Sequence, residues 1–142
     1  MKLEEQRRID RPQDEVFAYV AEFSNSAEWD PGVDSARRLD DGPLGVGSRF
    51  HVEVKFGGTT SPMTYEILTY EPDRRVVLEG KGERVTALDD IRFRTEDGAT
   101  VVDYTADLEF KGLLGFVAPL LTPYLKKNVG AKALDGLVAT LQ

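Results

Sequence analysis

Residues 9–33 decide how the fold begins, and they read IDRPQDEVFAYVAEFSNSAEWDPGV. Pro12 suits the first turn of a helix, because its missing N–H would have no partner there. Asp14 and Glu15 follow in the same turn, where carboxylates meet the positive end of the helix dipole. We therefore expect a short strand that ends near Ile9 and a helix that begins at Pro12.

Large apolar residues after Pro12 recur at helical spacing and form one stripe, which consists of Val16, Phe17, Val20 and Phe23. A second, very short helix is expected next, because residues 25–28 have the spacing of a capping box. This helix would present Trp29, the only tryptophan of the chain, before a turn at residues 30–32.

The composition limits the classes of protein to which the chain can belong. Its 142 residues suffice for one domain, residues 1–142, with a core and a cavity. The absence of cysteine excludes disulfides and thiolate metal sites, and it favours a reducing compartment. The net charge of −7, with basic residues scattered singly or in pairs, argues against nucleic acid and anionic membrane as main partners.

No part of the chain predicts insertion into a membrane. The N-terminus is charged and has no apolar signal region. The most apolar run, residues 113–121, contains Gly115 and Pro119 and is too short to span a bilayer. We expect a cytoplasmic protein without integral membrane association, either a monomer or a homodimer.

The middle of the chain, residues 33–110, predicts a series of strands separated by turns. Residues 48–56 alternate cleanly, and Gly57 and Gly58 then provide a hairpin signal. Further strands are expected at residues 63–70, 76–79, 84–94 and 100–110, with a break at residues 80–82. Because short turns join consecutive strands, the sheet should be an antiparallel meander with one apolar face that needs a cover.

The cover is predicted after Gly112, where apolar residues recur every three or four positions. A helix of about thirty residues would be roughly 45 Å long and would cross the whole sheet. Pro119 and Pro123 each remove a backbone hydrogen bond, so the helix either bends there or begins at Thr122. We favour the bend. The apolar residues of this helix are Phe116, Leu120, Leu121, Tyr124, Leu125, Val129, Ala133, Leu134, Leu137, Val138 and Leu141.

This order of motifs resembles that of the polyketide cyclase/dehydrase and START-like (SRPBCC) superfamily over essentially the full length. The resemblance rests on the residues Arg11–Phe17, the Trp29–Pro31 corner, the Gly42–Phe50 loop and strand, the Tyr70–Arg75 turn and the terminal amphipathic helix. It implies the α+β helix-grip fold, in which a curved antiparallel meander wraps around a long C-terminal helix and two short helices follow the first strand. Members of such families bind lipids, sterols, plant hormones or polyketides between the sheet and the last helix, and only some are enzymes.

Asp89 is the main candidate for chemistry. Alternation along residues 85–93 places it on the same face as Ile91 and Phe93, which we take as the inner face. An ionised carboxylate buried there needs a partner or a raised pKa, and either would suit a polar anchor or a general base. The alternative is a β-bulge at Asp89 and Asp90 that turns both acids to solvent.

Three aromatic residues each allow two interpretations. Tyr65 and Tyr104 fall on apolar faces, where each supplies either a cavity wall with one hydroxyl or an ordinary core ring. Trp29 lies near the expected cavity mouth, and we favour a structural wedge over a stacking platform. The predicted ligand-binding set is Trp29, Phe50, Val52, Val54, Tyr65, Ile67, Ala87, Asp89, Tyr104, Phe116, Leu120 and Tyr124.

Neither a metal site nor a cofactor is expected. His51 is the sole histidine, and alternation places it on the polar face beside Glu53. Ser-His-Asp or Cys-His catalysis has no supporting spacing. Gly42, Gly45 and Gly47 lack the lysine of a phosphate loop, so we interpret them as turn residues.

Three functions remain open from the sequence. The first is a carrier or sensor that holds a small hydrophobic molecule, lipid-like, sterol-like or polyketide-like, under the last helix. The second is a polyketide cyclase or dehydratase, in which Asp89 acts as the base while Tyr65 or Tyr104 polarises a carbonyl. The third is a protein-interaction or chaperone-cofactor module, which ranks last because the sequence shows no exposed apolar stripe.

Overall fold

The computed structural model of the chain describes residues 1–56, 58–112 and 114–142. The predicted hairpin residue Gly57, and the side chains of Phe56, Leu121 and Thr122, lie outside what the structure describes. Over the described residues, seven strands form one antiparallel sheet in the order β1-β7-β6-β5-β4-β3-β2. From β2 to β7 each strand pairs with the next, and β1 joins the far edge beside β7.

The elements follow one another in the order that the sequence predicts. The strands are β1 Lys2–Ile9, β2 Val33–Arg38, β3 Arg49–Phe56, β4 Thr59–Glu71, β5 Arg75–Gly82, β6 Val85–Glu96 and β7 Ala99–Phe110. The helical segments are α1 Gln13–Ala21, η1 Phe23–Asn25, α2 Ser26–Trp29, α3 Leu114–Leu125, η2 Lys126–Gly130 and α4 Ala131–Leu141. This arrangement confirms the predicted helix-grip fold.

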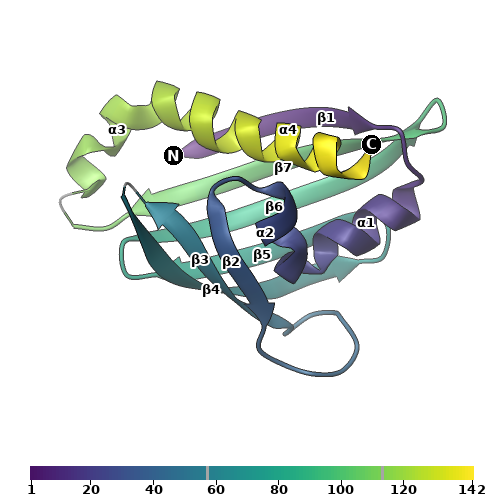
Figure 1. The fold of residues 1–142 in the computed structure, drawn as a ribbon, viewed down its shortest axis with the longest axis horizontal. Coiled ribbons are helices and arrows are strands. Elements are labelled where there is room, and N and C mark those ends of the chain that lie inside the picture. Colours follow the sequence, from purple (N-terminus) through teal and green to yellow (C-terminus); the bar gives the residue numbers. More distant parts are fainter. Residues whose placement is uncertain (57, 113) are drawn as a thin grey trace.

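The sheet is strongly curved, and the helices lie on its concave side. In Figure 1, strands β2 to β4 run steeply across the direction of β5 to β7, and α4 runs along the sheet near β1 and β7. The helix α4 contacts both β1 and α2, so it closes the sheet along one edge and against the N-terminal helices. A space bounded by strands on one side and by a helix on the other follows from this curvature.

The strand β5 is longer than predicted, because the expected break at residues 80–82 does not occur. Gly80 pairs with Tyr65 of β4 and with Ala87 of β6. A Cβ atom at Gly80 would lie 2.6 Å from the ring of Tyr65, which is far closer than a Cβ can approach. The glycine therefore makes room for the tyrosine ring within a continuous strand.

The two N-terminal helices form where expected, but their first residues act differently from the prediction. Pro12 is the N-cap residue of α1, which begins one residue later at Gln13. Asn25 precedes α2 without a capping hydrogen bond from its side chain. Its amide Nδ2 instead donates to the carbonyl oxygen of Tyr19 at 3.0 Å, so the expected capping box is absent.

Trp29 is buried in the core, and its backbone comes close to α4. Its side chain is 2 % exposed, and the carbonyl group of the same residue faces Gly136 of α4. A Cβ at Gly136 would lie 2.0 Å from that carbonyl oxygen, so glycine is required for this close approach. The contact fixes the distance between α2 and α4.

The C-terminal helical region bends, as the two prolines predict. Helical structure begins at Leu114, with Pro119 and Pro123 inside α3, so the alternative start at Thr122 is wrong. A π-helical turn, η2, then leads into α4. Figure 1 shows α3 rising steeply at one end of the molecule before α4 runs along the sheet. Among the described residues, no helix combines the length and the apolar character needed to cross a membrane.

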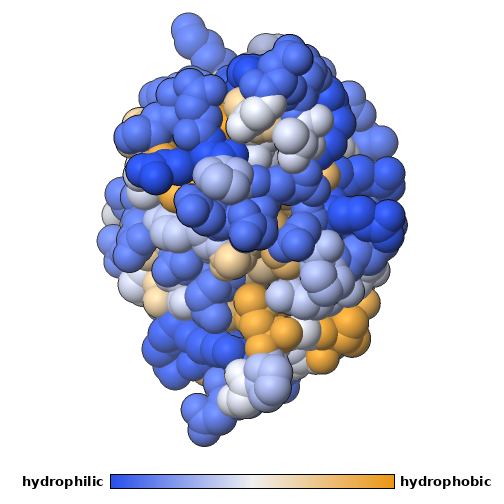
Figure 2. All heavy atoms as spheres, turned by 90° about the vertical axis from the view of Figure 1, so that its right-hand side faces the viewer, coloured by the Kyte–Doolittle hydropathy of each residue, from blue (hydrophilic) through white to orange (hydrophobic). Residues whose placement is uncertain are grey.

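The bend leaves an apolar stripe of α3 in solvent, contrary to the sequence-based expectation. Phe116, Leu120 and Tyr124 follow one another at four-residue spacing, and their exposed fractions are 82 %, 81 % and 62 %. Figure 2 looks onto the opposite end of the molecule, beyond α1, where the surface is mainly hydrophilic apart from a hydrophobic patch in the lower part of the view. The stripe of α3 lies at the other end of the molecule, where these three large side chains are exposed together.

Candidate ligand-binding site

A cavity of about 190 Å³ lies between the concave face of the sheet and the C-terminal helices. Most of its wall is aliphatic, with contributions from β3, β4, β6, β7 and α4. A cavity of about 150 Å³ in another protein accommodates benzene, so this space suits a group the size of one ring. The aliphatic lining includes Val33, Val52, Val54, Val85, Ala106, Leu108, Leu125, Val129 and Leu134.

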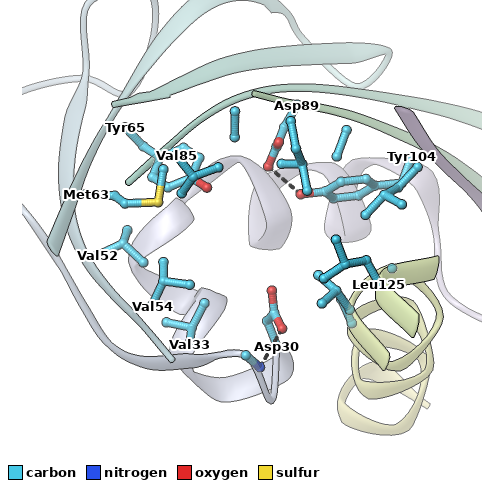
Figure 3. Close-up of a pocket in the computed structure, with 18 of the residues that line it drawn as sticks. Asp30, Val33, Val52, Val54, Met63, Tyr65, Val85, Asp89, Tyr104 and Leu125 are labelled. Carbon is cyan, nitrogen blue, oxygen red and sulfur yellow. Dashed lines mark hydrogen bonds between the residues drawn. The ribbon is translucent and has the colours of Figure 1, made fainter. Parts of the chain in front are cut away.

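Half of the predicted ligand-binding residues line this cavity. They are Val52, Val54, Tyr65, Ala87, Asp89 and Tyr104. They come from the four strands β3, β4, β6 and β7. Figure 3 shows five of them, Val52, Val54, Tyr65, Asp89 and Tyr104, around one open space. Their side chains could therefore contact one small molecule.

The other six residues of the predicted set do not line the cavity. Trp29, Phe50 and Ile67 are buried in the core, where the ring of Phe50 lies 6.2 Å from that of Phe23. Phe116, Leu120 and Tyr124 are exposed on α3. Alternation identifies the inner face of a strand but not the part of that face beneath the cavity. The bend of the last helix, moreover, removes α3 from the sheet.

Asp89 points into the cavity, so the bulge that would turn it outward is absent. It pairs with Leu78 of β5 and Ala106 of β7 in an unbroken register, and it is 4 % exposed. Asp90 points outward and accepts two hydrogen bonds from Arg75, at 3.0 and 2.9 Å. Partial burial raises the pKa of Asp90, but the hydrogen bonds from Arg75 lower it, and the resulting pKa lies below its usual range.

The carboxyl group of Asp89 forms a pair with the hydroxyl of Tyr104. The Tyr104 O–H donates to Oδ2 at 2.5 Å (Figure 3). Burial raises the pKa of Asp89 to about 7, and the nearby Asp30 adds to this rise, whereas the tyrosine bond opposes it. At neutral pH the group therefore exists in both protonation states, which suits proton transfer as well as hydrogen bonding.

Asp30 is the second carboxyl group of the cavity, and the sequence identified it only as a turn residue. Its Oδ1 accepts the N–H of Gly32 at 2.8 Å, which closes the turn after α2. Burial raises the pKa of Asp30 to about 6, although the Gly32 N–H and Lys55 lower it. Turn formation fully explains an aspartate at this position, so no sequence signal revealed that its side chain also faces the cavity.

Tyr65 adds a hydroxyl group from β4. Its side chain is 8 % exposed, and its ring lies 4.8 Å from that of Phe23. Burial, together with the nearby Asp89 and Asp30, raises the pKa of Tyr65 well above its ordinary value, so the hydroxyl stays protonated. Within the described residues, no hydrogen bond engages it, and the group is available to a ligand.

The part of the chain that the structure describes contains no group of three His, Cys, Asp or Glu side chains that could hold a metal ion. His51 lies on the outer face, with Nε2 3.7 Å from a carboxylate oxygen of Glu53. Among the described residues, the ionisable side chains that line the cavity are Glu5, Asp30, Lys55, Tyr65, Asp89 and Tyr104.

The fold and this cavity define a class of protein with a curved sheet, a long C-terminal helix and an internal hollow between them. The chain belongs to the family described as polyketide cyclase / dehydrase and lipid transport, whose model matches residues 1–142. A search of proteins of curated function finds no match.

Solved structures share the fold at low sequence identity. TTHA0849 from Thermus thermophilus is 16 % identical with a TM-score of 0.83, and the match covers 99 % of this chain and 97 % of that one. The ZhuI aromatase/cyclase from Streptomyces sp. R1128 is 16 % identical with a TM-score of 0.75, over 99 % and 93 % of the two chains. A START superfamily protein from Mycobacterium smegmatis is 15 % identical with a TM-score of 0.70, over 99 % of each chain.

Proposed function

We propose that the protein binds a small hydrophobic molecule in the cavity, as a carrier or a sensor. The observation that carries this proposal is the cavity itself, which has an aliphatic wall and a few polar groups at fixed positions. Such a combination gives affinity through the apolar wall and orientation through the polar groups. A fully packed interior would have neither.

A filled-cavity variant tests this proposal. Ala106→Phe places a ring in the cavity from β7, whereas Ala139→Phe makes the same change on the exposed side of α4. Sterols, fatty acids and aromatic polyketides are screened by thermal shift, and native mass spectrometry identifies any compound that co-purifies. We expect the bound compound to be lost from folded Ala106→Phe and retained by Ala139→Phe. Equal retention by both variants would refute the proposal.

A second function, a cyclase or dehydratase reaction, is favoured by the Asp89–Tyr104 pair. Asp89 has a pKa near neutrality and could accept a proton from carbon next to a carbonyl. The hydroxyl of Tyr65 could donate a hydrogen bond to the carbonyl oxygen as negative charge develops there. The family description, polyketide cyclase / dehydrase and lipid transport, makes a polyketide chain the first substrate to test.

Asp89→Asn distinguishes the two functions, because an amide cannot act as a base but keeps the size of the side chain. If the protein is an enzyme, turnover of a polyketide chain should disappear while the ligand still binds. Turnover that persists in Asp89→Asn would remove this residue from the mechanism.

A further inference from the structure

The charges that line the cavity are unevenly distributed. Three carboxyl groups, from Glu5, Asp30 and Asp89, contribute to the lining among the described residues, and Lys55 is the one basic residue there. Lys55 is exposed, and its charge lowers the pKa of Asp30, although not enough to offset the effect of burial. Figure 3 shows Asp30 and Asp89 on opposite walls, with the open space between them.

In each of these two aspartates, one carboxyl oxygen accepts a hydrogen bond from the protein and the other is available to a ligand. Oδ2 of Asp89 accepts from Tyr104, and Oδ1 of Asp30 accepts from the Gly32 backbone. Within the described residues, Oδ1 of Asp89 and Oδ2 of Asp30 accept no hydrogen bond. Asp89 is only 4 % exposed, so water can replace the missing donor only inside the cavity itself.

We infer that the ligand is a lipophilic amine whose ammonium group lies between Asp30 and Asp89 while its apolar part occupies the aliphatic side of the cavity. This inference rests on the proposed function, because it names the class of ligand for the same cavity. An ammonium group offers up to three N–H donors and a positive charge, which among the described lining residues only the exposed Lys55 supplies. A carboxylate ligand such as a fatty acid would bring a further negative charge close to these aspartates, which is unfavourable in a buried site.

The inference predicts how binding depends on pH. A bound cation stabilises the ionised forms of Asp30 and Asp89, so binding releases protons in the range where these groups titrate. The other charged or titratable groups that line the site are Glu5 on β1, Lys55 on β3, Tyr65 on β4 and Tyr104 on β7. Neither tyrosine ionises near neutral pH, because burial raises the pKa of each. Affinity for an amine should therefore rise from pH 5.5 to pH 8.

Three probes of similar size test the inference by calorimetry: 2-phenylethylamine, 2-phenylethanol and 3-phenylpropionate. We expect the amine to bind at least about tenfold more tightly than the alcohol at pH 8, a difference that shrinks at pH 5.5. Asp89→Asn and Asp30→Asn should each reduce the preference for the amine. Asp107→Asn, an exposed change on β7, should preserve it.

The three probes separate failure of the inference from failure of the proposed function. Equal binding of alcohol and amine at pH 8, or tighter binding of the phenylpropionate, would refute the amine inference and leave the cavity as a binding site. If none of the three probes binds the wild-type protein, the inference fails, and the larger compounds of the screen then decide the proposed function.

A separate observation concerns the exposed stripe of α3, which consists of Phe116, Leu120 and Tyr124. Residues 110–134 contain four lysines and no aspartate or glutamate, although the whole chain has a net charge of −7. The four are Lys111, Lys126, Lys127 and Lys132, and all of them are exposed. Residues 110–134 are therefore both basic and apolar, although the chain as a whole is acidic.

We propose that this stripe docks on an anionic lipid bilayer. Apolar side chains of a helix enter the boundary of the acyl region, and nearby lysines are attracted to anionic headgroups. A second copy of the chain would place the lysines of one stripe against those of the other, which disfavours a symmetric dimer there. Leu125 and Val129 line the cavity at the end of α3 and just beyond it, so a docked α3 would bring the cavity close to the bilayer surface.

Co-sedimentation with vesicles tests the docking proposal. We expect binding to vesicles of equal parts phosphatidylcholine and phosphatidylglycerol, and much weaker binding to phosphatidylcholine alone. Leu120→Ser should weaken it, and Lys127→Glu should weaken it by at least roughly fivefold. Val46→Ser changes an exposed apolar residue outside α3 and should have no effect. Equal binding to both vesicles, or binding to neither, would refute the proposal. Self-association that Leu120→Ser abolishes would then assign the stripe to contact with a second copy of the chain.

Discussion

The helices α3 and α4 belong to one continuous helical region and are both rich in apolar residues, yet they differ in what they bury. In α4, Leu134 and Leu137 are 0 % exposed and pack on the core. In α3, Phe116 and Leu120 are 82 % and 81 % exposed. Apolar periodicity alone therefore does not determine burial, because a helix buries its apolar stripe only where it lies over the sheet.

The bend between the two helices determines which of the two apolar stripes packs against the rest of the protein. Two prolines in α3 remove backbone hydrogen bonds, and the π-helical turn that follows changes the phase of the helix. Past this point α4 lies against β1 and α2, whereas α3 has few contacts with the sheet. The same region that covers the cavity thus also presents an exposed surface beside it.

The largest effect should come from placing a charge on the buried side of α4. Leu137→Asp puts a carboxylate into the core and should lower the free energy of unfolding by about 3–5 kcal/mol, enough to unfold a marginal domain. Urea denaturation followed by circular dichroism measures this change. A native, equally stable variant would contradict the assigned face of α4.

The second-largest effect should be a dependence of stability on pH, because Asp89 is buried beneath α4. Its pKa is about 7 in the folded state, compared with about 3.9 when unfolded. Between these two pKa values the folded state therefore binds more protons than the unfolded state. The contribution of Asp89 to the free energy of unfolding is fully present below pH 4 and is lost as pH rises through 7. The loss should be on the order of 3 kcal/mol.

Urea denaturation at pH 5 and pH 8 measures this loss, with two variants for comparison. Asp89→Asn should reduce the difference between the two pH values, because an amide does not titrate, and a smaller difference should remain from Asp30, whose pKa is raised by burial to about 6. Leu120→Ser on α3 should retain the wild-type difference. A wild-type protein that is more stable at pH 8 than at pH 5 would contradict the burial of Asp89.

A smaller effect is expected at the contact between α4 and α2. Gly136→Ala brings a methyl group against the carbonyl oxygen of Trp29 and should destabilise the protein by about 1–3 kcal/mol. Gly130→Ala is the matched control, since its Cβ would lie 3.4 Å from the nearest atom of Glu5. Thermal denaturation should show a lower midpoint for Gly136→Ala only. Equal midpoints would mean that α2 and α4 are not in close contact.

The smallest effect is expected on the exposed side of α3. Leu120→Asp, the same kind of change as Leu137→Asp, should alter the free energy of unfolding by less than about 0.5 kcal/mol. The reason is that the side chain is already in water before the change. Urea denaturation of the two aspartate variants side by side makes the comparison quantitative. A loss as large as that of Leu137→Asp would show that α3 packs on the protein in solution.

Part of the site could be predicted from the sequence, and the missing part has definite causes. The sequence left Asp89 either inward by alternation or outward at a bulge, and the unbroken register of β6 decides for the inward orientation. The sequence did not predict Asp30 as a cavity residue, because the hydrogen bond that it accepts from Gly32 already explains an aspartate in a turn. Gly80 suggested the end of a strand, whereas it accommodates the ring of Tyr65 on the neighbouring strand. In both cases one residue serves a local and a distant contact, and only the local one leaves a sequence pattern.

The sequence by itself determined the order of the elements, the meander, the apolar faces of β3, β6 and β7 and the two prolines that bend the last helix. These features depend on neighbours within a few residues, and periodicity and turn chemistry record them. The tertiary structure alone decided where along the strands the cavity lies, that Asp30 faces Asp89 across it, and that α3 extends past the sheet. These features depend on how curved and bent elements meet in space, where small changes in direction move a side chain between core, cavity and solvent.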